Sequence, residues 1–294
     1  ARPPVRDACA ATAAMALFGR LMASSRRLLL PAAGAGGAAA LYVQSEYRDF
    51  RALQEDGACE ASLPSTADAQ LTRVVRLPKY FSKEEVDQIH ALHRDVGGHV
   101  GTSGRTASNQ AASYHTGVWE VSYLSTDSHF REKLPELREK LVQAATQADD
   151  AERWGMLRGR EHVRPRCVEY HVVGPKGSLP FPHHHDAGSL ITVDVMLAEE
   201  GDFTGGTFQT LEPDGTMTKH LFERGDAIVF VSHKPHCVDA VRSGERRVLV
   251  MELWEGEERS CGHRCDRHWG ECGHTASHSF WRRALSDIGS DLER

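Results

Sequence analysis

The spacing of apolar residues predicts a strand and two helices in the first part of the fold. Residues 71–81 (LTRVVRLPKYF) are typical of a strand. Ser82 and Glu85 then match a capping box, in which the serine caps the first helical turn and the glutamate reaches back to it. We expect that helix to run to about Asp95. Over residues 129–152, apolar side chains recur at spacings of three and four, which predicts an amphipathic helix.

Beyond Arg164 the hydrophobic period changes to two, and short apolar runs alternate with turn sequences such as GPKG, EEGD and EPDG. The runs are RCVEYHVV, SLITVDVMLA, GTFQTLE, DAIVFV, HCVDAV and RRVLVMELW. Several short strands at close, regular intervals are typical of a sandwich or a barrel-like roll. The pattern therefore predicts a mainly β domain with flanking helices.

The start of the chain differs in texture. Residues 1–45 are rich in Ala, Arg and Gly and show no sustained period. Within them, residues 28–43 form an apolar run after two arginines, but the run is shorter than the roughly 20 residues of a membrane-spanning helix. A signal peptide, a signal anchor, an organellar transit peptide and a disordered arm all stay open. We expect a leader over residues 1–68, a folded domain over 69–256 and a Cys/His-rich tail over 257–294.

The charge and the cysteine and histidine content of the chain limit the kinds of binding partner to expect. The 294 residues include 35 Lys and Arg against 41 Asp and Glu, a formal net charge of −6. A mildly acidic chain has no general electrostatic reason to bind a polyanion, so nucleic acid is not an expected partner. The 7 cysteines cannot all pair with one another, and the 17 histidines gather at 183–185, near 236 and in the tail. Clustered histidines indicate a metal.

Two histidines and an aspartate form a candidate metal site. His184 and Asp186 lie just ahead of a strand, and if the extended backbone reaches back this far, both side chains project from one face and can chelate one ion. His236 follows a later strand, and Arg246 follows His236. Two histidines and one carboxylate form the facial triad of non-haem Fe(II) oxygenases, which leaves coordination positions open for a 2-oxo acid and dioxygen.

With these motifs the sequence resembles the Fe(II)/2-oxoglutarate-dependent dioxygenases, in particular the prolyl 4-hydroxylase and procollagen-lysine hydroxylase branch, over roughly residues 74–254. The elements that carry the resemblance are HHDAGSLIT (184–192), FTGGTF (203–208), GDAIVF (225–230), HCVDAVRSGER (236–246) and the closing strand VLVMELW (248–254). The resemblance implies a double-stranded β-helix (jelly roll) core, iron held by His184, Asp186 and His236, and Arg246 paired with the distal carboxylate of 2-oxoglutarate.

The same resemblance implies further contacts and an activity. Tyr170 stands where the family often places a tyrosine that touches the co-substrate, and Thr192 is expected near the co-substrate or in the core. Where some relatives have a tyrosine this chain has Met196, and Asp194 interrupts an apolar strand, either as a partner for Arg246 or facing solvent. The implied reaction is hydroxylation of an unactivated C–H of a peptidyl prolyl or lysyl residue, with decarboxylation of 2-oxoglutarate to succinate and with ascorbate as a further cofactor.

The tail contains a second cluster. Residues 261–274 (CGHRCDRHWGECGH) hold three cysteines and three histidines. Cys261, Cys265 and Cys272 with either His268 or His274 could supply four zinc ligands, although the spacing matches no standard zinc finger closely. Zinc, disulfide pairing and a His-rich tail of no special role all stay open.

Two other functions compete with the hydroxylase. One is a catalytically silent β-roll that binds a partner through the Cys/His tail, and the other is an oxygenase of a free small molecule. Expected partners are dioxygen, a peptide or protein substrate or a small molecule, and a membrane only through an N-terminal anchor. The leader is compatible with the secretory pathway and endoplasmic reticulum, or with an organelle.

Overall fold

The computed structural model describes residues 63–96, 102–104 and 119–272. In it, the segments with alternating apolar residues form the strands of two antiparallel β sheets. These residues all belong to one compact unit, Asp49–Arg294. The larger sheet has the order β1-β10-β6-β13-β4-β3-β2, formed by Val75–Leu77, Ala227–Val231, Ile191–Met196, Arg246–Glu255, Val163–Val173, Trp119–Tyr123 and Thr102–Gly104. The smaller sheet has the order β5-β11-β8-β9, formed by Leu179–His184, His236–Val238, Phe208–Leu211 and Met217–His220.

Successive strands cross between the sheets. β4 lies in the larger sheet, β5 in the smaller and β6 in the larger; β8 and β9 follow in the smaller, β10 in the larger, β11 in the smaller and β13 in the larger. A short pair, β12 (Val241–Gly244) with β7 (Phe203–Gly205), closes one end. This alternation defines a double-stranded β-helix, a form of jelly roll, and it confirms the predicted fold class.

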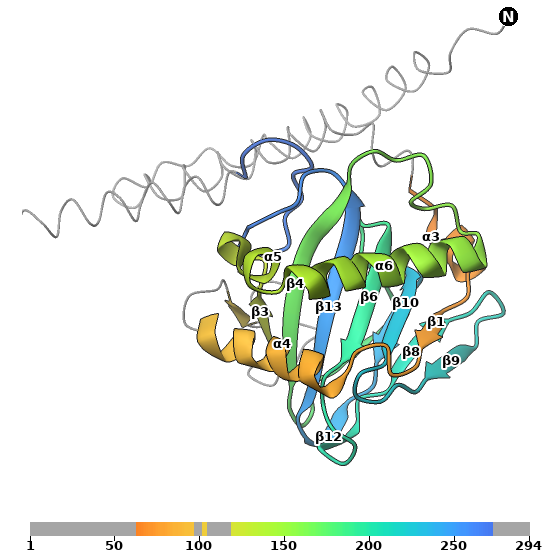
Figure 1. Ribbon diagram of the computed structural model, residues 1–294. Coiled ribbons are helices and arrows are strands. Elements are labelled where there is room, and N and C mark those ends of the chain that lie inside the picture. Colours follow the sequence, from red (N-terminus) through yellow and green to blue (C-terminus); the bar gives the residue numbers. More distant parts are fainter. Residues whose placement is uncertain (1–62, 97–101, 105–118, 273–294) are drawn as a thin grey trace, which may run out of the picture. The chain divides into compact units, whose positions relative to one another are not determined.

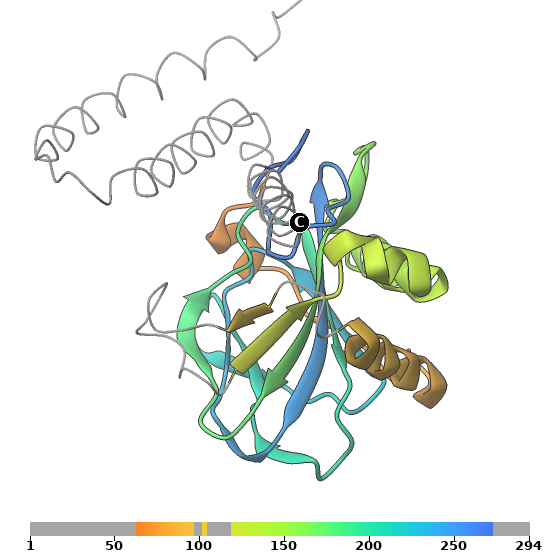
Figure 2. The same cartoon turned by 90° about the vertical axis from the view of Figure 1, so that its left-hand side faces the viewer.

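Helices cover the outer face of the larger sheet. α4 (Lys83–Val96) and α6 (Pro135–Glu152) cross in front of it in Figure 1, and Figure 2 shows both helices on the same side. Both helices bury apolar side chains in one cluster with the outward side chains of the sheet. These are Val86, Ile89 and Leu92 of α4 and Leu137 and Leu141 of α6. The smaller sheet therefore covers the opposite face of the larger sheet. A short helix, α3 (Thr66–Gln70), precedes β1.

The predicted capping box is confirmed at the start of α4. The Ser82 hydroxyl accepts from the Glu85 amide at 3.2 Å, and the Glu85 carboxylate accepts from the Ser82 amide at 2.7 Å. Each side chain thus satisfies a backbone donor that the first helical turn leaves unpaired.

The prediction of a single helix over residues 129–152 is wrong. A 3-10 turn, η4 (Thr126–Ser128), leads into α5 (His129–Lys133), and α6 begins only at Pro135. Leu134 between them has φ −131° and ψ 53°, outside the helical region. The proline ring clashes with the preceding residue in a helical conformation, so the helix breaks there although the apolar spacing continues.

The predicted leader and tail are described only in part. Residues 28–43 lie outside the described residues, and among those that are described no helix is long and apolar enough to cross a membrane. The tail is described as far as Cys272, where its three cysteines pack with the buried Trp254 of β13. This part of the tail therefore packs on the β domain.

Candidate metal centre

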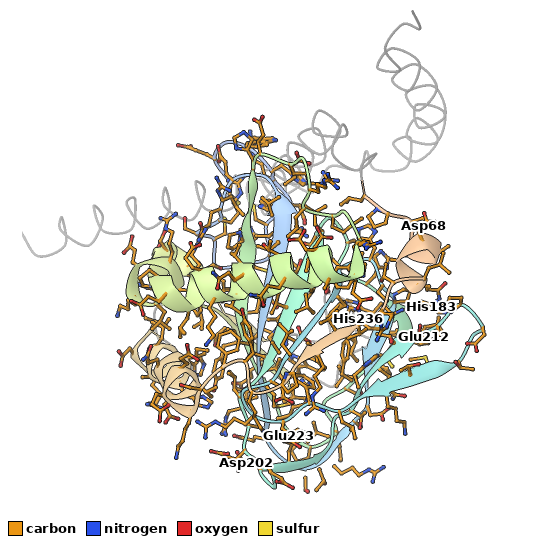
Figure 3. All side chains as sticks on the ribbon, turned by 45° about the vertical axis from the view of Figure 1, so that its right-hand side comes forward. Asp68, His183, Asp202, Glu212, Glu223 and His236 are labelled. Carbon is orange, nitrogen blue, oxygen red and sulfur yellow. The ribbon has the colours of Figure 1, made fainter. Side chains whose placement is uncertain are left out.

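The paired ends of two strands of the smaller sheet bring two histidines together. His184 ends β5 and His236 begins β11, and the two residues are direct cross-strand partners. His236 lies in the interior, whereas His183, the residue before His184, is exposed (Figure 3). Asp186 follows β5, and its amide donates to the Ser232 carbonyl at 2.8 Å, which ties its loop to the segment that leads into His236.

The three side chains that the sequence singled out converge on one point. His184 Nε2 lies 3.5 Å and His236 Nε2 lies 4.0 Å from Asp186 Oδ1. All three ligand atoms lie within 4.8 Å of one another. Donors held at about 2.1 Å from a shared ion stand roughly 3–4 Å apart, so this set fits a single divalent metal.

The protonation states also suit metal binding. His236 Nδ1 donates to the Lys234 carbonyl at 2.9 Å, which leaves the Nε2 lone pair facing Asp186. Burial lowers the pKa of His236 to about 4, so the ring is neutral at physiological pH. Burial alone would raise the pKa of Asp186, but the positive charge that His236 carries when it is protonated and the hydrogen bond from His184 outweigh burial and lower that pKa. A neutral imidazole and an ionised carboxylate are the forms that bind a metal.

Thr192, expected near the co-substrate or in the core, is buried and contacts the carboxylate of Asp186. Its hydroxyl donates to Asp186 Oδ2 at 2.8 Å and lies 2.9 Å from the Ser232 hydroxyl. One carboxylate oxygen of Asp186 is therefore held by Thr192, while the other faces the two histidines.

Arg246 lies in the same pocket as the three converging side chains. It is 2% exposed, and its Nε has no hydrogen-bond partner among the described residues. Burial lowers its pKa to about 10, so the guanidinium stays charged at neutral pH. Its guanidinium carbon lies 5.7 Å from the centre of the Phe222 ring. A buried guanidinium with an unpaired N–H donor is suited to bind an anion.

The FTGGTF motif makes room for that arginine. Gly206 has φ +62°, and a Cβ at this position would lie 2.9 Å from Arg246 Cδ and 3.0 Å from Val241 Cγ2. Any larger residue would therefore displace the arginine side chain as well as strain the backbone.

Asp194 faces the pocket and not the solvent. Burial raises its pKa to about 8, and the charge of Arg246 opposes that rise. At neutral pH the carboxyl is therefore mostly protonated and can donate a hydrogen bond into the pocket. Met196, on the same strand where some relatives have a tyrosine, is also buried.

Tyr170 does not reach the pocket, and its predicted contact with a co-substrate is wrong. Its hydroxyl lies 2.7 Å from His90 Nδ1, and its ring stacks on His93 at 3.9 Å between centroids. Both histidines belong to α4, so Tyr170 points into the helix layer. Side chains alternate along a strand, and the neighbouring Glu169 and His171 take the pocket face of β4.

Glu169 and His171 are site residues that sequence reasoning missed. His171 Nε2 lies 2.7 Å from the Glu169 carboxylate, and the Trp119 indole donates to His171 Nδ1 at 3.3 Å. The register of the structure places them, because Val173 is the direct partner of Arg246. Residues 169, 171 and 173 share one face of β4, and so the pocket face follows once β4 and β13 are aligned.

The tail supplies a further pocket residue that no periodicity could reveal. Arg264 lines the pocket and donates through Nε to both Glu252 oxygens, at 2.7 and 2.9 Å. Its Nη2 donates to the Ala187 carbonyl at 3.0 Å, beside Asp186.

The second metal-type cluster is also present, with a different histidine. The ligand atoms of Cys261, His263, Cys265 and Cys272 lie within 4.8 Å of one another. His268, one of the two histidines expected there, instead stacks on Trp254 at 4.4 Å and bonds the Glu255 carbonyl. The other, His274, lies outside the described residues.

Comparisons with known proteins concern the fold. No protein family matches the sequence, and no curated protein matches it significantly. Among solved structures, a prolyl-4-hydroxylase from Pseudomonas putida is 15% identical with a TM-score of 0.46, covering 66% of this chain and 99% of that one. A prolyl hydroxylase from Trichoplax adhaerens, solved with a hypoxia inducible factor peptide fragment, is 13% identical with a TM-score of 0.49, covering 69% and 92%.

A 2OG-Fe(II) oxygenase family protein from Burkholderia pseudomallei is 17% identical with a TM-score of 0.46, covering 67% of this chain and 88% of that one. Likeness at this level does not extend to the substrate or the reaction.

Proposed function

We propose that the protein is an Fe(II)- and 2-oxoglutarate-dependent dioxygenase that hydroxylates an unactivated C–H. One observation carries the proposal: the donors of His184, Asp186 and His236 lie within 4.8 Å of one another in a pocket that also contains the buried, unpaired Nε of Arg246. A metal site and an anion site therefore share one cavity.

The donor set fits ferrous iron. His184, Asp186 and His236 would hold the ion by two imidazole nitrogens and one carboxylate oxygen, and this set would leave coordination positions to ligands from solution. When bound, the iron would supply the activation of dioxygen that no amino-acid side chain provides. The rings of Phe208 and Phe230 pack against His236 at 5.5 and 5.1 Å and limit water on that side.

Arg246 would bind the co-substrate. The planar guanidinium matches the two oxygens of a carboxylate and stays charged when desolvated, which a buried lysine does less reliably. The protonated carboxyl of Asp194 lines the same pocket and can orient the dicarboxylate by a hydrogen bond. The co-substrate would span from the metal to Arg246.

The substrate we propose is a peptidyl prolyl or lysyl residue, supported by the sequence motifs that resemble the prolyl and lysyl hydroxylases. Oxidation of one 2-oxoglutarate to succinate and carbon dioxide provides two electrons, and the substrate C–H provides the other two that reduce dioxygen. One oxygen atom enters succinate and the other enters the hydroxyl group. Ascorbate would keep the iron ferrous between turnovers.

The test is succinate formation by the full chain with Fe(II), 2-oxoglutarate, dioxygen and a panel of proline- and lysine-containing peptides, with mass spectrometry for a gain of one oxygen. We expect iron-dependent succinate, and we expect Asp186→Ala to abolish it, because removing the carboxylate leaves two ligands. Asp214→Ala, in an exposed turn, is the matched control and should keep full activity.

Absence of succinate under all these conditions would contradict the proposal and favour a silent binding module. Succinate formation by Asp186→Ala at the rate of the parent would remove the assignment of the metal ligands.

A further inference from the structure

We propose that Cys261, His263, Cys265 and Cys272 bind one structural zinc ion. The proposal is independent of the iron site, since it uses none of the same ligands. The three cysteines are 4%, 1% and 7% exposed, and the four ligand atoms lie within 4.8 Å of one another. They gather in a segment that leaves the end of β13 and packs on Trp254.

The donor set and the spacing fit zinc. Three thiolates and one imidazole are among the ligand sets of structural zinc sites, which are four-coordinate and closed to solvent. With Zn–S near 2.3 Å and Zn–N near 2.0–2.1 Å, a tetrahedron places a sulfur and a nitrogen about 3.6 Å apart. Cys272 Sγ lies 3.4 Å from His263 Nε2, close to that separation.

A disulfide explains this cluster less well. A disulfide joins two sulfurs and gives no reason for a third thiol and an imidazole at the same point. Cys261, His263 and Cys265 alternate along the chain, and they meet Cys272 from the far end of the same segment. All four converge, which is what a tetrahedral ion requires.

The segment also has a physical need for a cross-link. Residues 257–272, all described, contain no helix and no strand, so no backbone ladder fixes them. The three cysteines and the His268 ring pack against Trp254, whose ring also lies 5.6 Å from the Arg259 guanidinium carbon. Short irregular segments of this kind depend on a metal or on disulfides to hold one conformation.

The position of Arg264 gives the ion a role in the domain. Arg264 stands between the ligands His263 and Cys265 and donates to Glu252 and to the Ala187 carbonyl. From the other side, Arg166 donates to the Cys265 carbonyl at 2.6 Å and to the Ala187 carbonyl at 2.7 Å. The zinc ion would hold the segment against the loop that carries Asp186.

The experiment is metal analysis of the full chain purified without chelator, combined with X-ray absorption at the zinc edge. We expect about one zinc per chain, with three sulfur ligands near 2.3 Å and one nitrogen ligand near 2.0 Å. Cys265→Ser and Cys272→Ser should lose most of the zinc. His268→Asn in the same segment and Cys237→Ser elsewhere are matched controls that should retain it.

A His236→Ala variant separates the two sites, because it should lose iron binding and keep its zinc. Zinc retention there, with no succinate formation by the parent, would leave this inference standing while the proposed function failed. A parent chain without zinc, zinc without sulfur ligands, or a Cys pair linked in the mass spectrum of the alkylated, unreduced chain would each overturn the zinc site. If the cysteine variants do not fold, the absorption spectrum of the parent alone decides.

Discussion

The carboxylate of Asp186 is held on both of its oxygens. Oδ1 faces the two histidines, and Oδ2 accepts a hydrogen bond from Thr192, whose hydroxyl also lies next to Ser232. Contacts behind a metal ligand fix its orientation and contribute to metal affinity. The threonine therefore belongs to the site although it does not line the pocket.

Replacement of Thr192 by valine tests that contact. The valine keeps the shape and removes the donor, so Fe(II) should bind roughly 10- to 100-fold more weakly while the fold is retained. Equilibrium dialysis with Fe(II) under anaerobic conditions measures the change. Thr204→Val, whose hydroxyl contacts only the exposed Ser243, is the control, and equal metal affinity of the Thr192 variant and the parent would contradict the role given to Thr192.

Single residues also show where sequence reasoning ends. The order and strand context of His184, Asp186 and His236, together with the downstream Arg246, named side chains that the structure brings together. Tyr170 was misplaced because β4 is buried on both faces, so hydrophobicity alone does not tell which alternate set faces the pocket. Arg264 comes from a segment without periodicity, and only tertiary contacts place it.

At the scale of elements, Asp226 of the GDAIVF motif joins β1 to the start of β10. Its buried carboxylate accepts from Arg76 Nε at 2.8 Å, from the Lys79 amide at 2.8 Å and from the Glu223 amide at 3.0 Å. Burial would raise the pKa of Asp226, but the two amides and Arg76 outweigh it and lower that pKa. The motif is thus structural at this position.

We expect Asp226→Asn to lower the free energy of unfolding by roughly 2–3 kcal/mol near neutral pH, because an amide cannot accept all of these bonds. A carboxyl whose pKa is lower in the folded state stabilises above its unfolded pKa and loses that contribution as pH falls through the folded pKa. The difference in the free energy of unfolding between parent and variant should therefore become smaller in acid.

Urea unfolding of both chains near neutral pH and in acid measures this gap, with the exposed Asp214→Asn as the control. A variant as stable as the parent near neutral pH, or a gap that widens in acid, would contradict the role of Asp226.

Elements were predictable where local rules agreed with packing. The capping box at Ser82 and the alternation after Arg164 gave one helix start and most strands of the two sheets. The prediction of one helix over residues 129–152 was wrong because the apolar spacing continues through Pro135, whereas the residue before a proline cannot stay in the helical conformation. Strand order was not predicted, since periodicity does not show which strands pair, and the family resemblance implied only the double-stranded β-helix.

For the whole molecule, the pocket exists only when the two sheets face each other. His184 and His236 come from the smaller sheet, Asp194 and Arg246 from the larger, and Arg264 from the segment after β13. Metal, co-substrate and fold should therefore stabilise one another, because ligands that bind only the folded chain raise its stability.

The most direct test is calorimetric titration of 2-oxoglutarate into the full chain under anaerobic conditions, with and without Fe(II). The account predicts binding that requires the metal, is lost in Asp186→Ala, and is weakened about tenfold or more in Arg246→Lys, which loses the planar fork. Binding of 2-oxoglutarate that is equally tight without metal, or unchanged in Asp186→Ala, would contradict a shared metal and co-substrate site.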